Sequence, residues 1–402
     1  MLKKVLVGSL VCALILGVVG CGPTLKFATP LKIGISRHPA TANYGRGVLE
    51  RLPSYDPKSR NYWQVDIRGC DLSSLALGGR LNDLLHSDFD SVTKWPDTLP
   101  EGFEPDEVME LAKDPGLGVR VLHEQGITGK GVGIAIIDQT LLVDHIEYKD
   151  RLIHYEEIHN KLLNSAMHGA AVASIAVGKT VGVAPEADLY YIAESHAPEN
   201  YDFTRQAKCV DRIVEINDSL PQASKIRVLS MSIDWSQDRK GYAEVVAAVE
   251  RAKAAGIFVV SASLYETYNQ TMFFSGLGRT PYADPNDPES YGPGASWSQT
   301  FFSGSFDREA LLFPMDARCT ASPTGESDYV FYSRGGVSWS IPYIAGLYAL
   351  ACQVKPDVTP DEFWEAGLST GDQVVLTQSG QSMLLSKIIN PEKLIRELSE
   401  SR

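Results

Sequence analysis

Short apolar runs alternate with helical stretches in the second half of this chain, and this alternation limits its possible folds more than any other feature. The first run, at 132–137, is continuous and rich in β-branched residues, which is typical of a strand buried on both faces. Similar runs follow at 189–193, 228–233 and 257–260. The stretch 244–252 has helical character, and Gly256 provides a natural helix end beyond it. This pattern predicts an α/β fold with a mostly parallel central sheet flanked by helices.

The N-terminus has the character of an export signal. Two lysines precede an apolar core at 5–19, and Gly20 and Cys21 follow this core. A basic start and a short apolar core are typical of a secretory leader rather than a membrane span. The residues before Cys21 resemble the lipobox of bacterial lipoproteins, and this resemblance implies cleavage before Cys21 and lipid on its thiol. We therefore expect a signal peptide at 1–20 and an extracytoplasmic protein that is lipid-anchored to a bacterial cell membrane. The alternative is an ordinary leader or an uncleaved anchor helix, with Cys21 incidental.

Charge and cysteine content exclude some classes of partner. The formal net charge is -13 and no basic stripe is present, which argues against a nucleic-acid partner. Beyond the leader, the cysteines are Cys70, Cys209, Cys319 and Cys352. They form no C-x-x-C pair, so they do not indicate a metal site of that kind. Their disulfide pairing stays open.

The chain before the alternating region contains few long periodic runs of apolar residues. Residues 21–120 are rich in Pro, Asp, Asn and Ser, and we expect a small N-terminal extension of uncertain fold ahead of a main domain at 121–402. Pro105 and the acidic residues after it indicate a helix start. The extension is interpreted as packing on the main domain, and a folding aid or pro-segment is the alternative.

Three motifs lie where strands end or helices begin. Asp138 follows the first apolar run directly, and His168 precedes Gly169 and a run of small residues. Ser338 follows two glycines at an expected helix start, with Pro342 expected in the first turn. In parallel sheets, active groups gather at the carboxyl ends of strands. A serine activated by a histidine, which an aspartate orients, is the arrangement that acyl transfer requires. Taken singly, each has a plain structural alternative: a turn-binding aspartate, a structural histidine and a helix-capping serine.

The contexts of these three residues resemble the subtilisin-like serine peptidases (subtilases) from Gly129 to about Trp364. The resemblance covers the aspartate segment at 131–138, the stretch at 145–151, the histidine motif at 168–173, the segment at 182–187, the serine motif at 336–342 and a capped helix start at 359–362. It implies a subtilisin-like three-layer fold and a protein or peptide substrate. It also implies Ser338 as nucleophile, His168 as general base and Asp138 as its orienting carboxylate, acting through an acyl-enzyme.

The chain departs from this family at the oxyanion hole. Tyr265 stands where subtilases have an asparagine whose amide donates to the oxyanion, and the loss of one such donor typically costs about 10²–10³ in turnover. Three explanations compete: Tyr265 donates its hydroxyl, Asn269 donates from the following loop, or the enzyme is slow or inactive. We favour a substitute donor, and Asn269 is the first candidate.

The resemblance also indicates where substrate binds. In subtilases a Ser-x-Gly segment pairs with the substrate backbone as an added strand, and the matching residues here are Ser232, Ile233 and Asp234. The Asp234 carboxylate predicts a preference for a basic or small residue before the cut, with a solvated loop acid as the alternative. No cofactor or metal is expected. Subtilases often bind structural calcium, but no Asp-rich loop here identifies a site.

Two other functions compete with a peptidase. The altered oxyanion hole would suit a non-catalytic binding protein on a subtilase scaffold. A lipoprotein that captures small ligands usually has two similar α/β lobes, whereas this chain has one alternating region.

Overall fold

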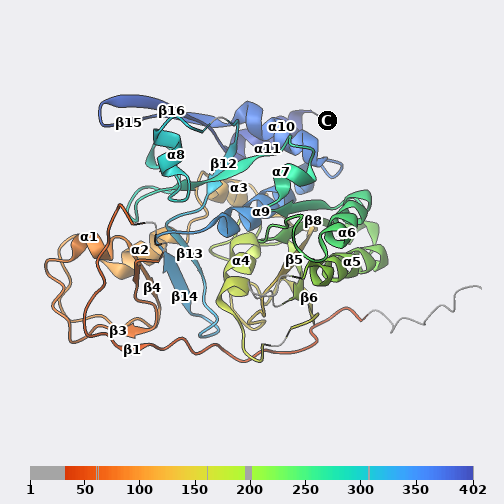
Figure 1. The fold of residues 1–402 in the computed structure, drawn as a ribbon. Coiled ribbons are helices and arrows are strands. Elements are labelled where there is room, and N and C mark those ends of the chain that lie inside the picture. The colour runs from red at the N-terminus through yellow and green to blue at the C-terminus, as the bar shows by residue number, and fades with distance from the viewer. Residues whose placement is uncertain are drawn as a thin grey trace, which may run out of the picture. The chain divides into compact units, whose positions relative to one another are not determined.

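The computed structural model describes residues 32–59, 61, 63–160, 162–194, 202–306 and 308–401. Ile33–Arg402 form one compact unit (Figure 1). The leader expected at 1–20 and Cys21 lie outside the described residues. The signal peptide and the lipid anchor therefore stay predictions.

A five-stranded parallel sheet forms the centre of this unit. Its spatial order is β6-β7-β5-β8-β9, and every neighbouring pair is parallel. The strands are β5 (Gly133–Asp138), β6 (Leu152–Glu157), β7 (Asp188–Ala193), β8 (Ile226–Met231) and β9 (Phe258–Ser261). Each of the four apolar runs in the sequence forms a strand, and all residues of β5 are buried. The predicted α/β class, with its mostly parallel sheet, is confirmed.

Helices cover both faces of this sheet. Figure 1 shows α5 (Phe203–Ser219) and α6 (Tyr242–Ala254) on one side, and α4 (Met167–Val177) and α9 (Val337–Val354) on the other. Helix α4 is buried from Gly169 to Val177, as expected for a helix that is apolar on all sides. Within the described residues, α9 alone is long and apolar enough to cross a membrane, but 78% of it is buried inside the protein. This burial is typical of a core helix.

A second sheet of order β11-β10-β12-β16-β15 lies beside the first. Its strands are β10 (Phe274–Gly278), β11 (Gly292–Pro293), β12 (Leu311–Pro314), β15 (Asp372–Gln378) and β16 (Gln381–Ile388). The accompanying helices are α3 (Val119–Glu124), α7 (Leu264–Thr267), α8 (Ser298–Phe302), α10 (Pro360–Thr370), α11 (Pro391–Glu400), η2 (Gln222–Ser224) and η3 (Pro288–Ser290). Helix α10 begins with the predicted capping box between Thr359 and Glu362.

The N-terminal extension shares a third sheet with the segment that precedes Ser338. Its strand β4 (Ser87–Asp90) pairs with β14 (Tyr329–Tyr332) in the order β13-β14-β4-β2, and Figure 1 shows β4 and β14 side by side. Phe89 faces Phe331 in the register, and their ring centroids lie 5.2 Å apart in one hydrophobic core. The remaining elements here are β1 (Gly47–Val48), β2 (Val65–Asp66), β3 (Cys70–Asp71), α1 (Leu81–Leu84), α2 (Pro105–Ala112) and β13 (Arg318–Ala321). The extension is thus built into the unit that carries the candidate site, while a domain boundary near 120 stays a prediction.

Candidate active site

Asp138 and His168 are in direct contact. Asp138 ends β5, and only 1% of its surface is exposed. Its Oδ1 atom lies 2.7 Å from His168 Nδ1 and accepts a 2.7 Å hydrogen bond from the Gln139 amide. A buried carboxylate is costly unless such partners stabilise its charge. The pair therefore has the geometry in which a carboxylate orients a histidine and stabilises its protonated form.

A close approach of α4 to β5 makes this contact possible. His168 lies in the first turn of α4, next to Gly169. A Cβ atom on Gly169 would lie 2.5 Å from the Gln139 carbonyl oxygen and 2.5 Å from Tyr191 Oη. The Tyr191 hydroxyl also donates a hydrogen bond to that carbonyl. Because the space is already filled, glycine is the residue that fits beside His168.

Ser338 is the second residue of α9, after Gly336 in an extended conformation. Pro342 lies inside the helix, and the expectation that it occupies the first turn is wrong. Since proline has no N–H, it cannot bond to the carbonyl four residues earlier, which is that of Ser338. The Ser232 hydroxyl donates to this Ser338 carbonyl instead, at 3.0 Å. This bond ties the expected substrate-binding strand to the helix that carries the serine.

Trp339 connects Ser338 to the Asp138–His168 pair. Its ring centroid lies 5.3 Å from that of His168, and the Trp339 side chain is buried. In the part of the chain that the structure describes, no hydrogen bond joins the Ser338 hydroxyl to the His168 ring; such bonds are often long before substrate binds. The structure thus joins the aspartate and histidine directly, and places the serine beside a residue that packs on the histidine.

The sequence reasoning missed one carboxylate, Asp316, which holds the segment before Ser338. Its Oδ1 accepts a 2.8 Å hydrogen bond from the Gly335 amide, and its Oδ2 accepts one of 3.0 Å from the Ala295 amide. Asp316 is 5% exposed, and burial raises its pKa to about 7. Asp316 lies two residues after the buried strand β12, and Asp138 ends the buried strand β5. A carboxylate at the end of a buried strand is thus the sequence pattern that could have identified it.

The raised pKa of Asp316 predicts a pH dependence of stability. Between the ordinary carboxyl pKa of about 4 and about 7, the folded state retains a proton that the unfolded state has lost. The contribution of Asp316 to the free energy of unfolding therefore falls as the pH rises through this window. Asp316→Asn removes the titration, so its stability relative to the parent is expected to rise by on the order of 4 kcal/mol from pH 4 to pH 8.

Urea unfolding at pH 4.5, 6 and 8 measures this difference. Asn presents an NH₂ group to one of the two backbone amides, which adds a destabilisation that is the same at every pH. Asp357→Asn, at an exposed position, is the control for loss of one negative charge. Parallel stability profiles for Asp316→Asn and the parent would contradict the prediction.

The two oxyanion candidates lie in and just after the short helix α7. The Tyr265 ring packs against Phe273, with centroids 5.6 Å apart, and Arg308 Cζ lies 5.1 Å from the Tyr265 centroid. Asn269 is exposed and has a left-handed backbone, with φ of 52°. Within the described residues, neither side chain forms a hydrogen bond with Ser338. Both donor assignments stay predictions.

The expected substrate-binding residues follow β8 directly. Ile233 is buried, and its carbonyl accepts a 3.1 Å hydrogen bond from the Ala262 amide. Ser263 Oγ accepts a 3.0 Å bond from the Trp235 amide. Asp234 lies between these two anchored residues and is exposed. Its proposed effect on cleavage preference stays a prediction.

The four cysteines and His145 lie in the interior of the protein. Cys70, Cys209, Cys319 and Cys352 are all buried and free, which answers the open question of their pairing. His145 is buried, and its Nε2 atom lies 2.9 Å from the Asp328 carbonyl oxygen. Across the described ranges, no group of three or more His, Cys, Asp or Glu side chains could hold a metal ion.

Known proteins share the segment that contains the aspartate and histidine. Residues 129–263 match the Subtilase family. The subtilase match includes Asp138 and His168 and ends before Ser338. The chain is 26% identical over 277 residues to serine protease AprX of Bacillus subtilis (strain 168), an alignment that covers 61% of this chain and 62% of AprX. It is 25% identical over 297 residues to subtilisin-like protease PopC of Myxococcus xanthus (strain DK1622), covering 65% of this chain and 60% of PopC.

A third relative matches a shorter region. The chain is 33% identical over 138 residues to subtilisin-like protease 2 of Arthroderma otae, which covers 34% of this chain and 31% of that protein. The chain thus spans about three fifths of the length of AprX and PopC, and less of the third relative.

Proposed function

We propose that this chain is a serine endopeptidase of the subtilase family, with Ser338, His168 and Asp138 as its catalytic triad. The observation that carries this proposal is the 2.7 Å contact between His168 Nδ1 and the buried Asp138. Both residues lie in the segment that matches the Subtilase family. Relatives named as serine or subtilisin-like proteases support the same reaction class.

In this mechanism the Ser338 hydroxyl attacks a peptide carbonyl while His168 Nε2 takes its proton. His168 then donates that proton to the leaving amine, which leaves an acyl group on Ser338. Water, activated by His168, releases the acyl group. Asp138 keeps the Nδ1 proton of His168 in place throughout. Amides at the start of α9 are oriented toward the developing oxyanion, and Asn269 or Tyr265 supplies a further donor.

Fluorophosphonate labelling of the purified full chain tests this proposal. The parent and Ser236→Ala are expected to be labelled, because Ser236 is an exposed serine outside the triad. Ser338→Ala and His168→Ala are expected to remain unlabelled. A well-folded parent that does not react would overturn the peptidase and favour a non-catalytic binding protein on the same scaffold.

The proposed enzyme acts on protein or peptide substrates outside the cytoplasm, where lipid on Cys21 anchors it to a bacterial cell membrane. The lipobox-like leader supports this location. Cys21→Ser is expected to move the protein from the membrane fraction to the soluble fraction after cell lysis. An unchanged distribution between the two fractions would contradict the anchor and leave the peptidase proposal intact.

A further inference from the structure

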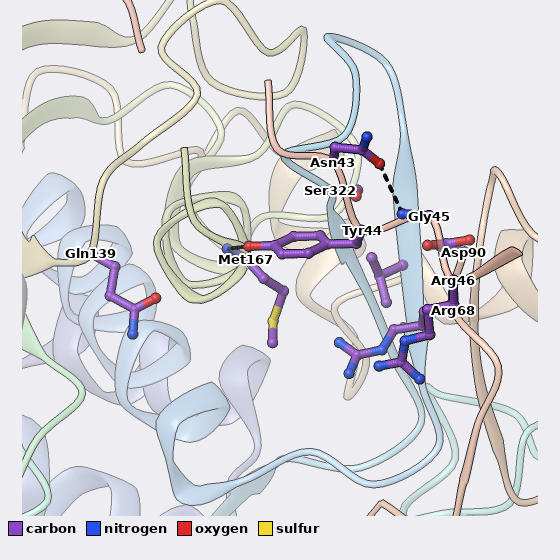
Figure 2. A pocket seen from close by; sticks show the side chains of 10 residues that line it. Asn43, Tyr44, Gly45, Arg46, Arg68, Asp90, Gln139, Met167 and Ser322 are labelled. Atoms are coloured by element: carbon purple, nitrogen blue, oxygen red, sulfur yellow. Dashed lines mark hydrogen bonds between the residues drawn. The ribbon is translucent and has the colours of Figure 1, made fainter. Parts of the chain in front are cut away.

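A cavity of about 420 Å³ adjoins the Asp138–His168 pair. Gln139 and Met167 form one wall, and each is next in sequence to a member of the pair. Tyr44, Arg46 and Arg68 of the N-terminal extension line the cavity as well, and Figure 2 shows the two arginines across from Met167. The cavity therefore exists because the extension packs against the subtilase segment.

Two sets of contacts place this cavity close to the reacting groups. The Tyr44 hydroxyl oxygen accepts a 3.3 Å hydrogen bond from the Met167 amide, directly before His168. The second set is a stack of side chains that begins at His168, whose ring packs on Trp339. The Trp339 ring lies 5.2 Å from the Tyr332 ring, which lies 5.2 Å from Arg68 Cζ. A group bound in the cavity is thus within a few extended residues of the scissile bond.

The cavity is separate from the residues expected to bind the substrate before the cut. The residues before the cut are expected to pair with Ser232–Asp234, and none of these three residues lines the cavity. Its walls come instead from the end of β5, the start of α4, β14 and the extension. A peptide that extends past His168 beyond the scissile bond would bring its following residues to this wall.

The guanidinium groups of Arg46 and Arg68 line the cavity and offer hydrogen-bond donors. Arg46 Nη2 and the Nε and Nη2 atoms of Arg68 share the carboxylate of Asp66, at distances of 2.5–2.8 Å. One carboxylate offsets one of the two positive charges, and N–H groups remain on both guanidiniums. The Arg46 side chain is 45% exposed. Figure 2 shows the two guanidinium groups next to each other, across from Met167.

The other carboxylates near this arginine pair are already engaged. Asp90 is 4% exposed, and its Oδ1 accepts bonds from the Gly69 amide and the Thr93 hydroxyl at 3.1 and 2.8 Å. Asp88 is 3% exposed and accepts bonds from the amide and hydroxyl of Ser333. Burial raises the pKa of Asp88 to about 7, so it is partly neutral at that pH. The carboxylates of Asp66 and Asp90 thus offset much of the charge of Arg46 and Arg68, and what the cavity offers an anion is the remaining N–H donors of the two guanidiniums.

We propose that this cavity binds a substrate carboxylate carried on the leaving-group side of the scissile bond, with Arg46 and Arg68 as its donors. The planar fork of an arginine matches a carboxylate in two parallel hydrogen bonds. The apolar surfaces of Met167 and Val330 suit the methylene groups that carry an acidic side chain. The proposal rests on the peptidase function above.

Cleavage of internally quenched peptides by the full chain tests this subsite. Peptide pairs differ by Glu or Gln at one position after the cut, and a second set compares a free C-terminal carboxylate with its amide. Loss of a charge-assisted hydrogen bond costs about 1.5–3 kcal/mol, so the acidic member of one pair is expected to show about 10- to 100-fold higher kcat/KM. The pair that shows this ratio identifies the source as a side chain or a chain end.

Arg46→Met is expected to bring that ratio close to one, and Arg46→Lys to retain part of it. Arg251→Met is the matched control, because Arg251 is 53% exposed and pairs with Asp211 far from the cavity. A parent that is labelled by fluorophosphonate but cleaves all pairs equally would overturn the subsite, as would a ratio unchanged in Arg46→Met. A parent that is neither labelled nor active would overturn the peptidase function and the subsite together.

Discussion

Asp138→Asn is expected to lower kcat for peptide hydrolysis by about 10⁴-fold while the protein remains folded. Asp138 Oδ1 lies 2.7 Å from His168 Nδ1 and accepts a hydrogen bond from it. An asparagine can present its NH₂ group to Nδ1, which turns the imidazole to the tautomer with its proton on Nε2. In that tautomer His168 cannot take the proton of Ser338. The small change in volume leaves the packing of β5 and α4 intact.

Steady-state hydrolysis of a peptide substrate, with circular dichroism as a check of folding, measures this effect. The chain provides a matched control in a second Asp–His pair, because Asp144 Oδ2 lies 2.8 Å from His38 Nδ1 at an exposed position. Asp144→Asn removes that pair and is expected to keep the parent kcat. A loss of less than tenfold for Asp138→Asn would show that Asp138 does not orient the catalytic base.

Gly169→Ala is expected to lower kcat/KM at least 100-fold, because it pushes His168 away from Asp138. The added Cβ would lie 2.5 Å from the Gln139 carbonyl oxygen and 2.5 Å from Tyr191 Oη. Neither atom can retreat freely, since Gln139 directly follows β5 and Tyr191 lies inside β7. The helix start must move instead, and a displacement of about 1 Å at a catalytic group can cost about 10²-fold in rate. Overpacking is also expected to lower the free energy of unfolding by about 1–3 kcal/mol.

Activity and urea unfolding of the same samples separate these two effects. Gly79→Ala serves as the control, because a Cβ at Gly79 meets nothing within 4 Å and its backbone is not left-handed. It is expected to match the parent in kcat/KM and to change stability little. Gly169→Ala with parent kcat/KM would mean that α4 adjusts without moving His168, and that the close approach does not set the geometry of the pair.

The fold class was predictable from local patterns. The four apolar runs form β5, β7, β8 and β9, and the helical stretch before Gly256 lies within α6. These features depend on residues that are close in sequence, so a single strand or helix reveals them. The contact between Asp138 and His168 followed from their motifs, because strand ends and helix starts meet at one edge of a parallel sheet.

Other parts of the candidate site were not predictable, for reasons of packing. Asp316 was overlooked, although it follows a buried strand, because nothing local indicates that its carboxylate holds the Gly335 amide. Pro342 was placed one turn too early, because helix boundaries are the least reliable part of a sequence pattern. The arginines of the cavity lie in a segment with no periodic pattern, and their role depends on the pairing of β4 with β14.

The sequence by itself determined four strands of the central sheet, the helical stretch before Gly256, and the motifs that contain Asp138, His168 and Ser338. Apolar periodicity, helix caps and short motifs are local properties, and burial of the apolar runs leaves few ways to arrange them. Only the tertiary structure decided that the N-terminal extension joins the sheet before Ser338, so that Arg46 and Arg68 lie across a cavity from Met167. Such contacts join residues more than 90 positions apart in the sequence. The register between β4 and β14 depends on the shared core around Phe89 and Phe331, and this core exists only after the chain has folded.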